Sequence, residues 1–289
     1  MSNPVFDRID DVSRKGGYAT FGGGRSSQSQ RGSQAAPQYG QYAPQNLDAR
    51  QLDDMYNAPS AGPVQMGRVT VDDVVMKGLG LFGLMIVTAA AVAFVVPALS
   101  PVLILPAIVV TLGLGLVIAF KKTISVPLIV GYAFFQGLLV GSVTVMYGSR
   151  FGSGVVTTAV VASLSVFVAM FAGWKFGIVK VTSKSRRILT LAIFGYLIFA
   201  LANLVAAWAF GANSGWGFFG FGSGMSILVS VFAVGLASYS LAMDFDSIDR
   251  AVAAQLPEKY SWLLAHGLLV TVVWLYLEIL RLVAQLQRN

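Results

Sequence analysis

The chain has 289 residues, of which 56% are hydrophobic and only 11% are charged, and its formal net charge is +7. A soluble domain carries about a quarter charged residues, so this composition indicates a membrane protein rather than two small soluble domains. The basic residues lie between apolar runs and form no separate basic domain, which argues against nucleic acid as a partner. Cysteine is absent, which excludes a disulfide framework, a thiolate nucleophile and a cysteine-based metal site. We therefore predict no cofactor and no metal.

The amino-terminal part of the chain is polar and of low complexity. Residues 1–69 include Gly22-Gly23-Gly24 and a glutamine- and tyrosine-rich stretch from Gln38 to Gln45. This segment has too few large apolar residues to offset the cost of ordering its backbone, so we expect a disordered cytoplasmic tail. A solvated tail is favoured over one that recruits partners, and the sequence names no protein partner for it.

Order is expected to begin at Thr70, which has capping-box spacing to Asp73. Seven apolar spans follow, each close to the ~20 residues that a helix needs to cross a bilayer. We therefore expect residues 70–289 to form an all-α integral membrane domain of seven transmembrane helices in contact with lipid. The spans run over 78–97, 102–120, 126–147, 154–174, 188–210, 223–243 and 260–281.

Two pairs of glycines have the GxxxG spacing that lets transmembrane helices approach closely. Gly137 and Gly141 lie within the third span, and Gly173 and Gly177 lie at the end of the fourth. Glycine is common in membrane spans, so both pairs are weak signals of helix contact.

The loops give the expected orientation. Lysine and arginine precede the first span and follow the second, fourth and sixth spans, whereas the loops after the first and fifth spans contain neither. The positive-inside rule then places the amino terminus in the cytoplasm. Seven full crossings would put Arg288 outside, and a re-entrant seventh span would keep both ends inside.

Acidic residues are confined to the two ends of the membrane domain. None occurs between Val74 and Met243, and then Asp244, Asp246 and Asp249 follow in quick succession. A charged side chain at the bilayer centre costs about 2.5–3.5 kcal/mol even on lenient scales, so an acid retained there is a functional candidate. We favour an interior position for Asp246, treat Asp249 and Arg250 as an exposed helix end, and leave the direction of the deeper Asp244 open.

The seventh span offers His266 and Glu278 as partners for these acids. Asp246 lies about eight residues before the turn, or ~12 Å along the helix, which is the depth of His266 in an antiparallel hairpin. Glu278 lies ~27 Å along the seventh span, near the opposite surface. We therefore predict that Asp246 meets His266, and that Glu278 forms an i,i+3 ion pair with Arg281. An Asp–His pair in a dry site would titrate as a coupled unit.

Three segments of the carboxyl-terminal third form a recognisable pattern: Met243-Asp244-Phe245-Asp246-Ser247-Ile248-Asp249, Leu256-Pro257-Glu258-Lys259-Tyr260-Ser261-Trp262, and the run from Gly267 to Leu282 with Leu275-Tyr276-Leu277-Glu278-Ile279. They resemble the Bax inhibitor-1-like (YccA-type) membrane family, in a bacterial branch with a long polar amino terminus. The likeness covers roughly residues 70–285, and its carboxyl-terminal third is the specific part.

The resemblance implies six helices around a central seventh, and a pH-sensitive, calcium-permeable leak in the bacterial inner membrane. In the family, gating is attributed to an aspartate late in helix six paired with one in helix seven. The first role falls on Asp246. The second falls at Val270 or Thr271, neither of which is acidic. Either Asp246 and His266 replace the pair, or this branch gates differently, or it does not conduct calcium.

The leading hypothesis is accordingly a pH-modulated cation leak that passes calcium or other cations and senses protons. Asp246 and His266 are its expected pH-sensing residues, and Asp244, Glu278, Arg281 and Thr271 are secondary candidates for the gate or pore. A proton-coupled secondary transporter and a non-conducting interaction or stress protein are the alternatives. An enzyme is not expected, because Ser223 lacks the leading glycine of a GxSG motif and residues 260–281 contain no Schiff-base lysine.

Overall fold

The computed structural model describes residues 67–209 and 224–288. In these residues the chain is helical without a strand, and seven of its helices are long and apolar enough to cross a membrane. This confirms the predicted all-α architecture with seven spans. The spanning helices are α3 (Val71–Phe94), α4 (Ser100–Phe120), α5 (Val126–Phe151), α6 (Ser153–Lys175), α7 (Ser183–Ala209), α8 (Gly224–Ala253) and α9 (Tyr260–Arg288), with a short 3-10 helix η1 (Pro97–Leu99) before α4.

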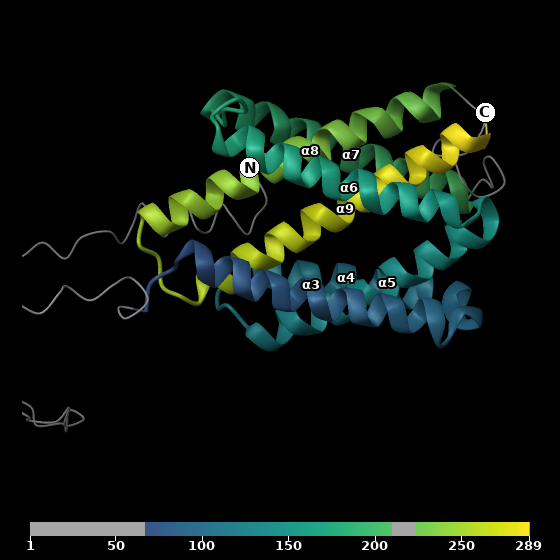
Figure 1. Ribbon diagram of the computed structural model, residues 1–289, viewed down its shortest axis with the longest axis horizontal. Helices are drawn as coiled ribbons and strands as arrows, with labels where there is room; N and C mark the ends of the chain where they lie inside the picture. The colour runs from purple at the N-terminus through teal and green to yellow at the C-terminus, as the bar shows by residue number, and fades with distance from the viewer. Residues whose placement is uncertain (1–66, 210–223, 289) are drawn as a thin grey trace, which may run out of the picture.

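Helix α9 occupies the middle of the bundle. It contacts α3 and α5 on one side and α6 and α8 on the other, and it crosses diagonally between these two groups (Figure 1). About 67% of its apolar span is buried, against at most 44% for any other described span. Within the described residues α4 packs mainly on α5, and α7 packs mainly on α8. Because α9 is a single unbroken helix of 29 residues, it is not the re-entrant hairpin that the sequence left open.

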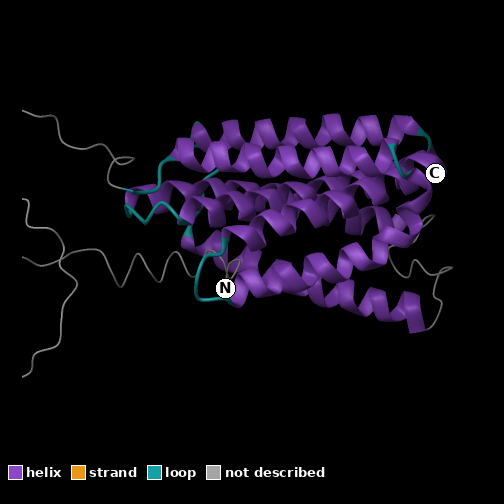
Figure 2. Cartoon of the chain, turned by 90° about the horizontal axis from the view of Figure 1, so that it is seen from below, coloured by secondary structure: helices purple, strands orange, loops and turns teal. Residues whose placement is uncertain are grey.

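The spanning helices run along a common direction, with their connecting loops gathered at the two ends of the bundle (Figure 2). Helix α8 is longer than the sixth apolar span, because it continues through the acidic cluster to Ala253. Asp244, Asp246 and Asp249 are therefore helical residues whose directions are fixed by the helix. Their three different directions decide what each carboxylate contacts.

The beginning of the described chain is tied to the turn between α8 and α9. The Val69 N–H donates to the Leu256 carbonyl oxygen at 2.8 Å, and the Glu258 N–H donates to the Gly67 carbonyl oxygen at 2.8 Å. Backbone pairing thus starts three residues before the expected onset of order at Thr70. The predicted cap at Thr70 is confirmed, since its Oγ1 accepts from the Asp73 N–H at 3.2 Å. The expectation for the rest of the tail falls on residues 1–66, outside the described part.

Of the two GxxxG pairs, only the first lies at a helix contact. Gly137 and Gly141 of α5 face α3 so closely that a Cβ at Gly141 would lie 2.6 Å from the Ala89 carbonyl oxygen. The second pair is not a helix contact, because Gly177 lies beyond the end of α6 with a φ of 70°. The Val179 N–H donates to the Gly173 carbonyl oxygen at 2.8 Å, and the Gly177 N–H donates to the Trp174 carbonyl oxygen at 3.0 Å. The second pair therefore closes a helix carboxyl terminus.

Candidate functional site

Asp246 is held by two arginines. Arg186, near the start of α7, donates from Nη2 to Asp246 Oδ2. Arg250, one turn further along α8, approaches the same oxygen at 3.3 Å. The Asp246 side chain is 26% exposed. It is therefore an ion-paired carboxylate at the basic end of the bundle, and it links α7 to α8.

The predicted meeting of Asp246 and His266 does not occur. All described polar contacts of Asp246 are made with α7 and with its own helix, whereas the His266 ring packs edge-on against Tyr132 of α5, with ring centroids 4.4 Å apart. The depth estimate from the antiparallel hairpin considered distance along the helices and not the direction of the side chains. Asp246 points from α8 toward α7, while His266 points from α9 toward α5. Asp249 is exposed as expected.

Asp244 is the most deeply enclosed of the α8 acids. Only 4% of its surface is exposed, and it lies beside the hydroxyl of Thr271 on α9. That hydroxyl donates to the carbonyl oxygen of Gly267 at 3.2 Å. Asp244 Oδ2 has no hydrogen-bond partner among the described residues, and no described cation pairs with the carboxylate. Burial of an uncompensated carboxylate is costly, so Asp244 has to hold either a proton or a cation.

Glu278 is the third enclosed carboxylate, and the predicted i,i+3 pair with Arg281 is confirmed. The pair is buried, since the two side chains are 7% and 13% exposed. The Tyr196 hydroxyl of α7 and Trp274 Nε1 both donate to Glu278 Oε1, the second at 3.1 Å. Glu278 is therefore compensated by charge and by hydrogen bonds, which sets it apart from Asp244.

A second polar contact continues from Arg281 toward the far end of the bundle. Arg281 Nε donates to Ser230 Oγ of α8 at 3.1 Å, and Ser230 Oγ donates to Gln285 Oε1 at 2.8 Å. Polar side chains thus follow the α8–α9 interface from Asp244 and Thr271 past the Glu278–Arg281 pair to Ser230 and Gln285. In the described part of the chain no group of three or more histidine, cysteine, aspartate or glutamate side chains could hold a metal ion.

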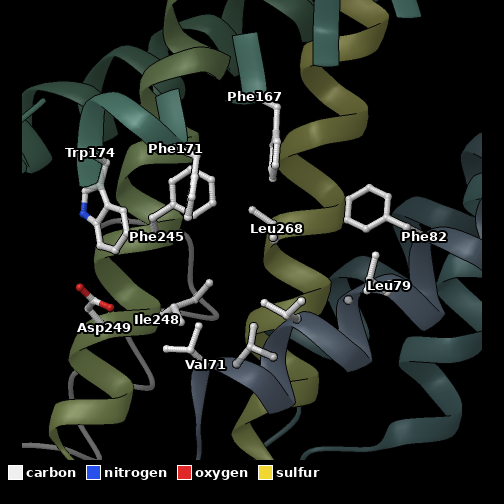
Figure 3. A pocket seen from close by; sticks show the side chains of 13 residues that line it. Val71, Leu79, Phe82, Phe167, Phe171, Trp174, Phe245, Ile248, Asp249 and Leu268 are labelled. Carbon is white, nitrogen blue, oxygen red and sulfur yellow. The ribbon is translucent and has the colours of Figure 1, made fainter. Parts of the chain in front are cut away.

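An apolar cavity lies beside this interface. Its volume is about 330 Å³, and its wall is built from α3, α6, α8 and Leu268 of α9. Figure 3 shows Phe167, Phe171, Trp174 and Phe245 gathered on one side of the cavity, with Asp249 at its edge. The aromatic rings contact one another, as in the pair of Phe171 and Phe245 with centroids 5.2 Å apart. The cluster packs on α8 at Phe245, the residue that precedes Asp246.

The model of the Bax inhibitor 1 like family matches residues 3–288. The chain belongs to the Bax inhibitor 1 like family. No curated protein matches it with significance. The match extends beyond residues 70–285, which the sequence resemblance covers, and it includes the polar amino-terminal segment.

Within this member of the Bax inhibitor 1 like family, the two positions implied by the resemblance do not face each other as a pair. The seventh-helix position is Val270 or Thr271, and Thr271 lies against Asp244 rather than Asp246. The acid in contact with the matching seventh-helix position is therefore Asp244, which the sequence left as a secondary candidate. Because Asp246 is two positions after Asp244 on α8, its side chain points to a different side of the helix.

Sequence reasoning missed Arg186, Tyr196, Ser230 and Gln285 as parts of the site. Arg186 belongs to the basic loop after the fourth span, which serves to predict the orientation. Nothing in the sequence connects it to Asp246, 60 residues later. Ser230 is uncharged and lies in an apolar run, and Gln285 is uncharged and lies beyond the predicted end of the seventh span. The available signal for such partners is a polar residue on the buried side of each of two neighbouring spans. To use that signal one must know which sides of the helices are buried, and the sequence alone does not give this.

Proposed function

We propose that this protein is a pH-modulated cation leak of the bacterial inner membrane, permeable to calcium, in which Asp244 carries the proton- or cation-dependent step. The observation that carries the proposal is the buried Asp244 carboxylate, whose Oδ2 has no hydrogen-bond partner and no cation among the described residues. Protons and cations compete for the same oxygen atoms at such a site. The proposal treats the protein as a conductor and not as an enzyme.

The polar contacts along the α8–α9 interface support a route for ions beside Asp244. Asp244 and Ser230 are 14 residues apart on α8, which corresponds to ~21 Å along the helix. The Glu278–Arg281 pair lies between these levels. Hydrogen-bonding side chains over most of the ~30 Å thickness of a hydrocarbon core are expensive unless they serve a function.

We also propose a cytoplasmic amino terminus. Lys121 follows the last residue of α4, and Lys175 is the last residue of α6. Both lie at the end of the bundle where α8 also ends, with Arg250 in its last turn. Short basic segments on one side of the membrane favour the cytoplasmic side. With seven crossings, the end of α9 then lies on the outer side.

The proposed leak predicts the pH dependence of calcium flux. In proteoliposomes, flux should rise between about pH 5 and about pH 8, because loss of the Asp244 proton leaves a negative charge that attracts cations. Asp244→Asn removes that charge at every pH and should give a low flux that no longer changes with pH. The measurement is calcium entry reported by an enclosed fluorescent indicator.

Asp246→Asn and Glu278→Gln are the comparison variants, because each of these carboxylates already pairs with an arginine. We expect both to keep a pH-dependent flux. The role of Asp244 is refuted if Asp246→Asn alone removes the pH dependence, and the leak itself is refuted if wild-type protein passes no calcium at any pH. The second outcome would support the non-conducting interaction protein.

A proton-coupled secondary transporter is the second candidate, and the same enclosed Asp244 favours it, since intramembrane carboxylates also serve as proton carriers. A leak only lets calcium equilibrate down its own gradient. A transporter would accumulate calcium inside vesicles against that gradient when a pH difference is imposed. Accumulation that collapses when a proton ionophore is added would assign the transporter.

A further inference from the structure

A groove between α4, α5 and α9 contains polar side chains that the proposed leak does not use. Its volume is about 380 Å³, and it is lined by Tyr132 and Gln136 of α5, by His266 of α9, and by residues of α4 that are apolar apart from Thr111. Tyr132, Gln136 and His266 are 7%, 6% and 3% exposed, respectively. The groove is on the other side of α9 from Asp246 and its arginines.

Of these side chains, His266 has a buried nitrogen, Nδ1, without a hydrogen-bond partner within the residues that the structure describes. A buried polar group without a hydrogen bond is destabilising, and native proteins satisfy nearly all such groups with protein, water or ligand. Together with the nearly buried Tyr132 and Gln136 at the same groove, this favours an occupant that can form hydrogen bonds.

The chemistry of the lining restricts the occupant. Among the residues that line the groove there is no lysine, arginine, aspartate or glutamate, so a charged ligand would lack a counter-charge. Phenol, carboxamide and neutral imidazole groups can each donate and accept hydrogen bonds. This set suits a neutral head that carries carbonyl or hydroxyl oxygens.

The groove is accessible from the side of the bundle that faces lipid. Leu112 and Leu116 of α4 line it, and they are 63% and 58% exposed. His266 is six residues after Tyr260, the first residue of α9, which places it about 9 Å along the helix and below the membrane surface. A ligand in the hydrocarbon region could enter sideways and leave an apolar tail along α4.

We propose that this groove binds a neutral lipid-soluble molecule with a carbonyl-bearing ring, the chemistry of a quinone, through Gln136, His266 and Tyr132. The ring lies against Tyr132, its oxygens accept hydrogen bonds from Gln136 and His266, and the tail follows Leu112 and Leu116. This site is separate from Asp244, so its presence or absence is independent of the leak.

The test uses decylubiquinone as the probe, with the full-length protein in lipid nanodiscs. We expect saturable binding, measured by equilibrium dialysis, and a rise in the unfolding temperature as the probe concentration increases. Decylbenzene has the same tail and a ring without oxygens, and it should bind at least ~10-fold more weakly, since a lost hydrogen bond of about 1.4 kcal/mol changes affinity tenfold. Dioctanoylglycerol tests whether a neutral lipid without a ring is preferred.

Two variants test the named contacts. Gln136→Leu and His266→Leu should each weaken decylubiquinone binding at least ~10-fold. Gln136→Leu should also unfold at the same or a higher temperature than wild type without ligand, because it replaces a nearly buried amide with an apolar side chain of similar volume. Phe171→Leu, in the separate apolar cavity of Figure 3, is the control and should leave binding unchanged.

Three results would overturn the proposal. Decylbenzene could bind as tightly as decylubiquinone, which would make the groove a place for apolar chains only. Dioctanoylglycerol could bind while decylubiquinone does not, which would exclude the ring. Gln136→Leu and His266→Leu could both bind the probe as wild type does, which would place the probe elsewhere on the protein.

Discussion

Arg281→Ala should destabilise the protein by about 3–5 kcal/mol, because it removes the cation from a buried ion pair and leaves Glu278 enclosed without its partner. Both side chains of the pair are at most 13% exposed. Arg281 also donates to Ser230 at 3.1 Å, so the substitution removes a contact between α9 and α8 as well. The free energy of unfolding can be measured by titrating the purified protein from mild detergent into sodium dodecyl sulfate.

The exposed pair of Lys77 and Glu258 provides a control on the same protein. Its atoms are 2.7 Å apart, but the Glu258 side chain is 52% exposed, and solvent screens such pairs to about 0–1 kcal/mol. Glu258→Gln should therefore cost under about 1 kcal/mol. An Arg281→Ala variant that is as stable as Glu258→Gln would contradict the importance of the buried pair.

Removal of both charges should reverse the effect of Arg281→Ala. The double variant Arg281→Met with Glu278→Gln leaves no enclosed charge without a partner, so it should recover most of the lost stability. If the double variant recovered nothing, packing of the Arg281 side chain and not its charge would be responsible.

The seven spans could be predicted from the sequence because each consists of a long apolar run bounded by polar or glycine-rich residues. The bilayer requires such runs, so hydropathy alone locates them. The helix ends were less accurate at α8, where the apolar run stops at Met243 and the helix continues to Ala253. The acidic cluster remains helical because it packs at the end of the bundle, and hydropathy carries no information about that packing.

The site was predicted only in part, and the limit is geometric. The helical rise per residue gives the position of a residue along the bundle. It correctly placed Asp246 and Glu278 at different positions along that direction. Direction around the helix decides the partner, and neighbouring residues on α8 point to different helices. Asp244 and Asp246 are only two positions apart, yet one lies against Thr271 of α9 and the other against Arg186 of α7.

The polar contacts also explain how α7 is attached to the bundle. Described backbone contacts join α7 mainly to α8, while its side chains reach polar partners at two levels. Arg186 contacts Asp246 near one end, and Tyr196 contacts Glu278 further along. Asp246 and Glu278 therefore both bind side chains of α7. Of the three carboxylates in the described structure, this leaves Asp244 as the one available for exchange with protons or cations.

Gly141→Ala should have the second large effect on stability, because α3 and α5 approach each other at this glycine. A Cβ at position 141 would lie 2.6 Å from the Ala89 carbonyl oxygen and 2.8 Å from the Ala89 Cα. Both atoms belong to the α3 backbone and cannot turn aside as a side chain can. The helices must separate, and overpacking of this kind costs about 1–3 kcal/mol.

Gly131→Ala is the matched control, since Gly131 is on the same helix and nothing lies within 4 Å of the added Cβ. Alanine is a better helix former than glycine by about 0.5–1 kcal/mol, so this variant should be as stable as wild type or more stable. The two substitutions are chemically identical and should shift the unfolding temperature in opposite directions. Equal shifts would mean that helix propensity dominates and that the close contact of α3 with α5 contributes little. Because α3 and α5 both pack on α9, a separation at Gly141 should also loosen the groove around His266.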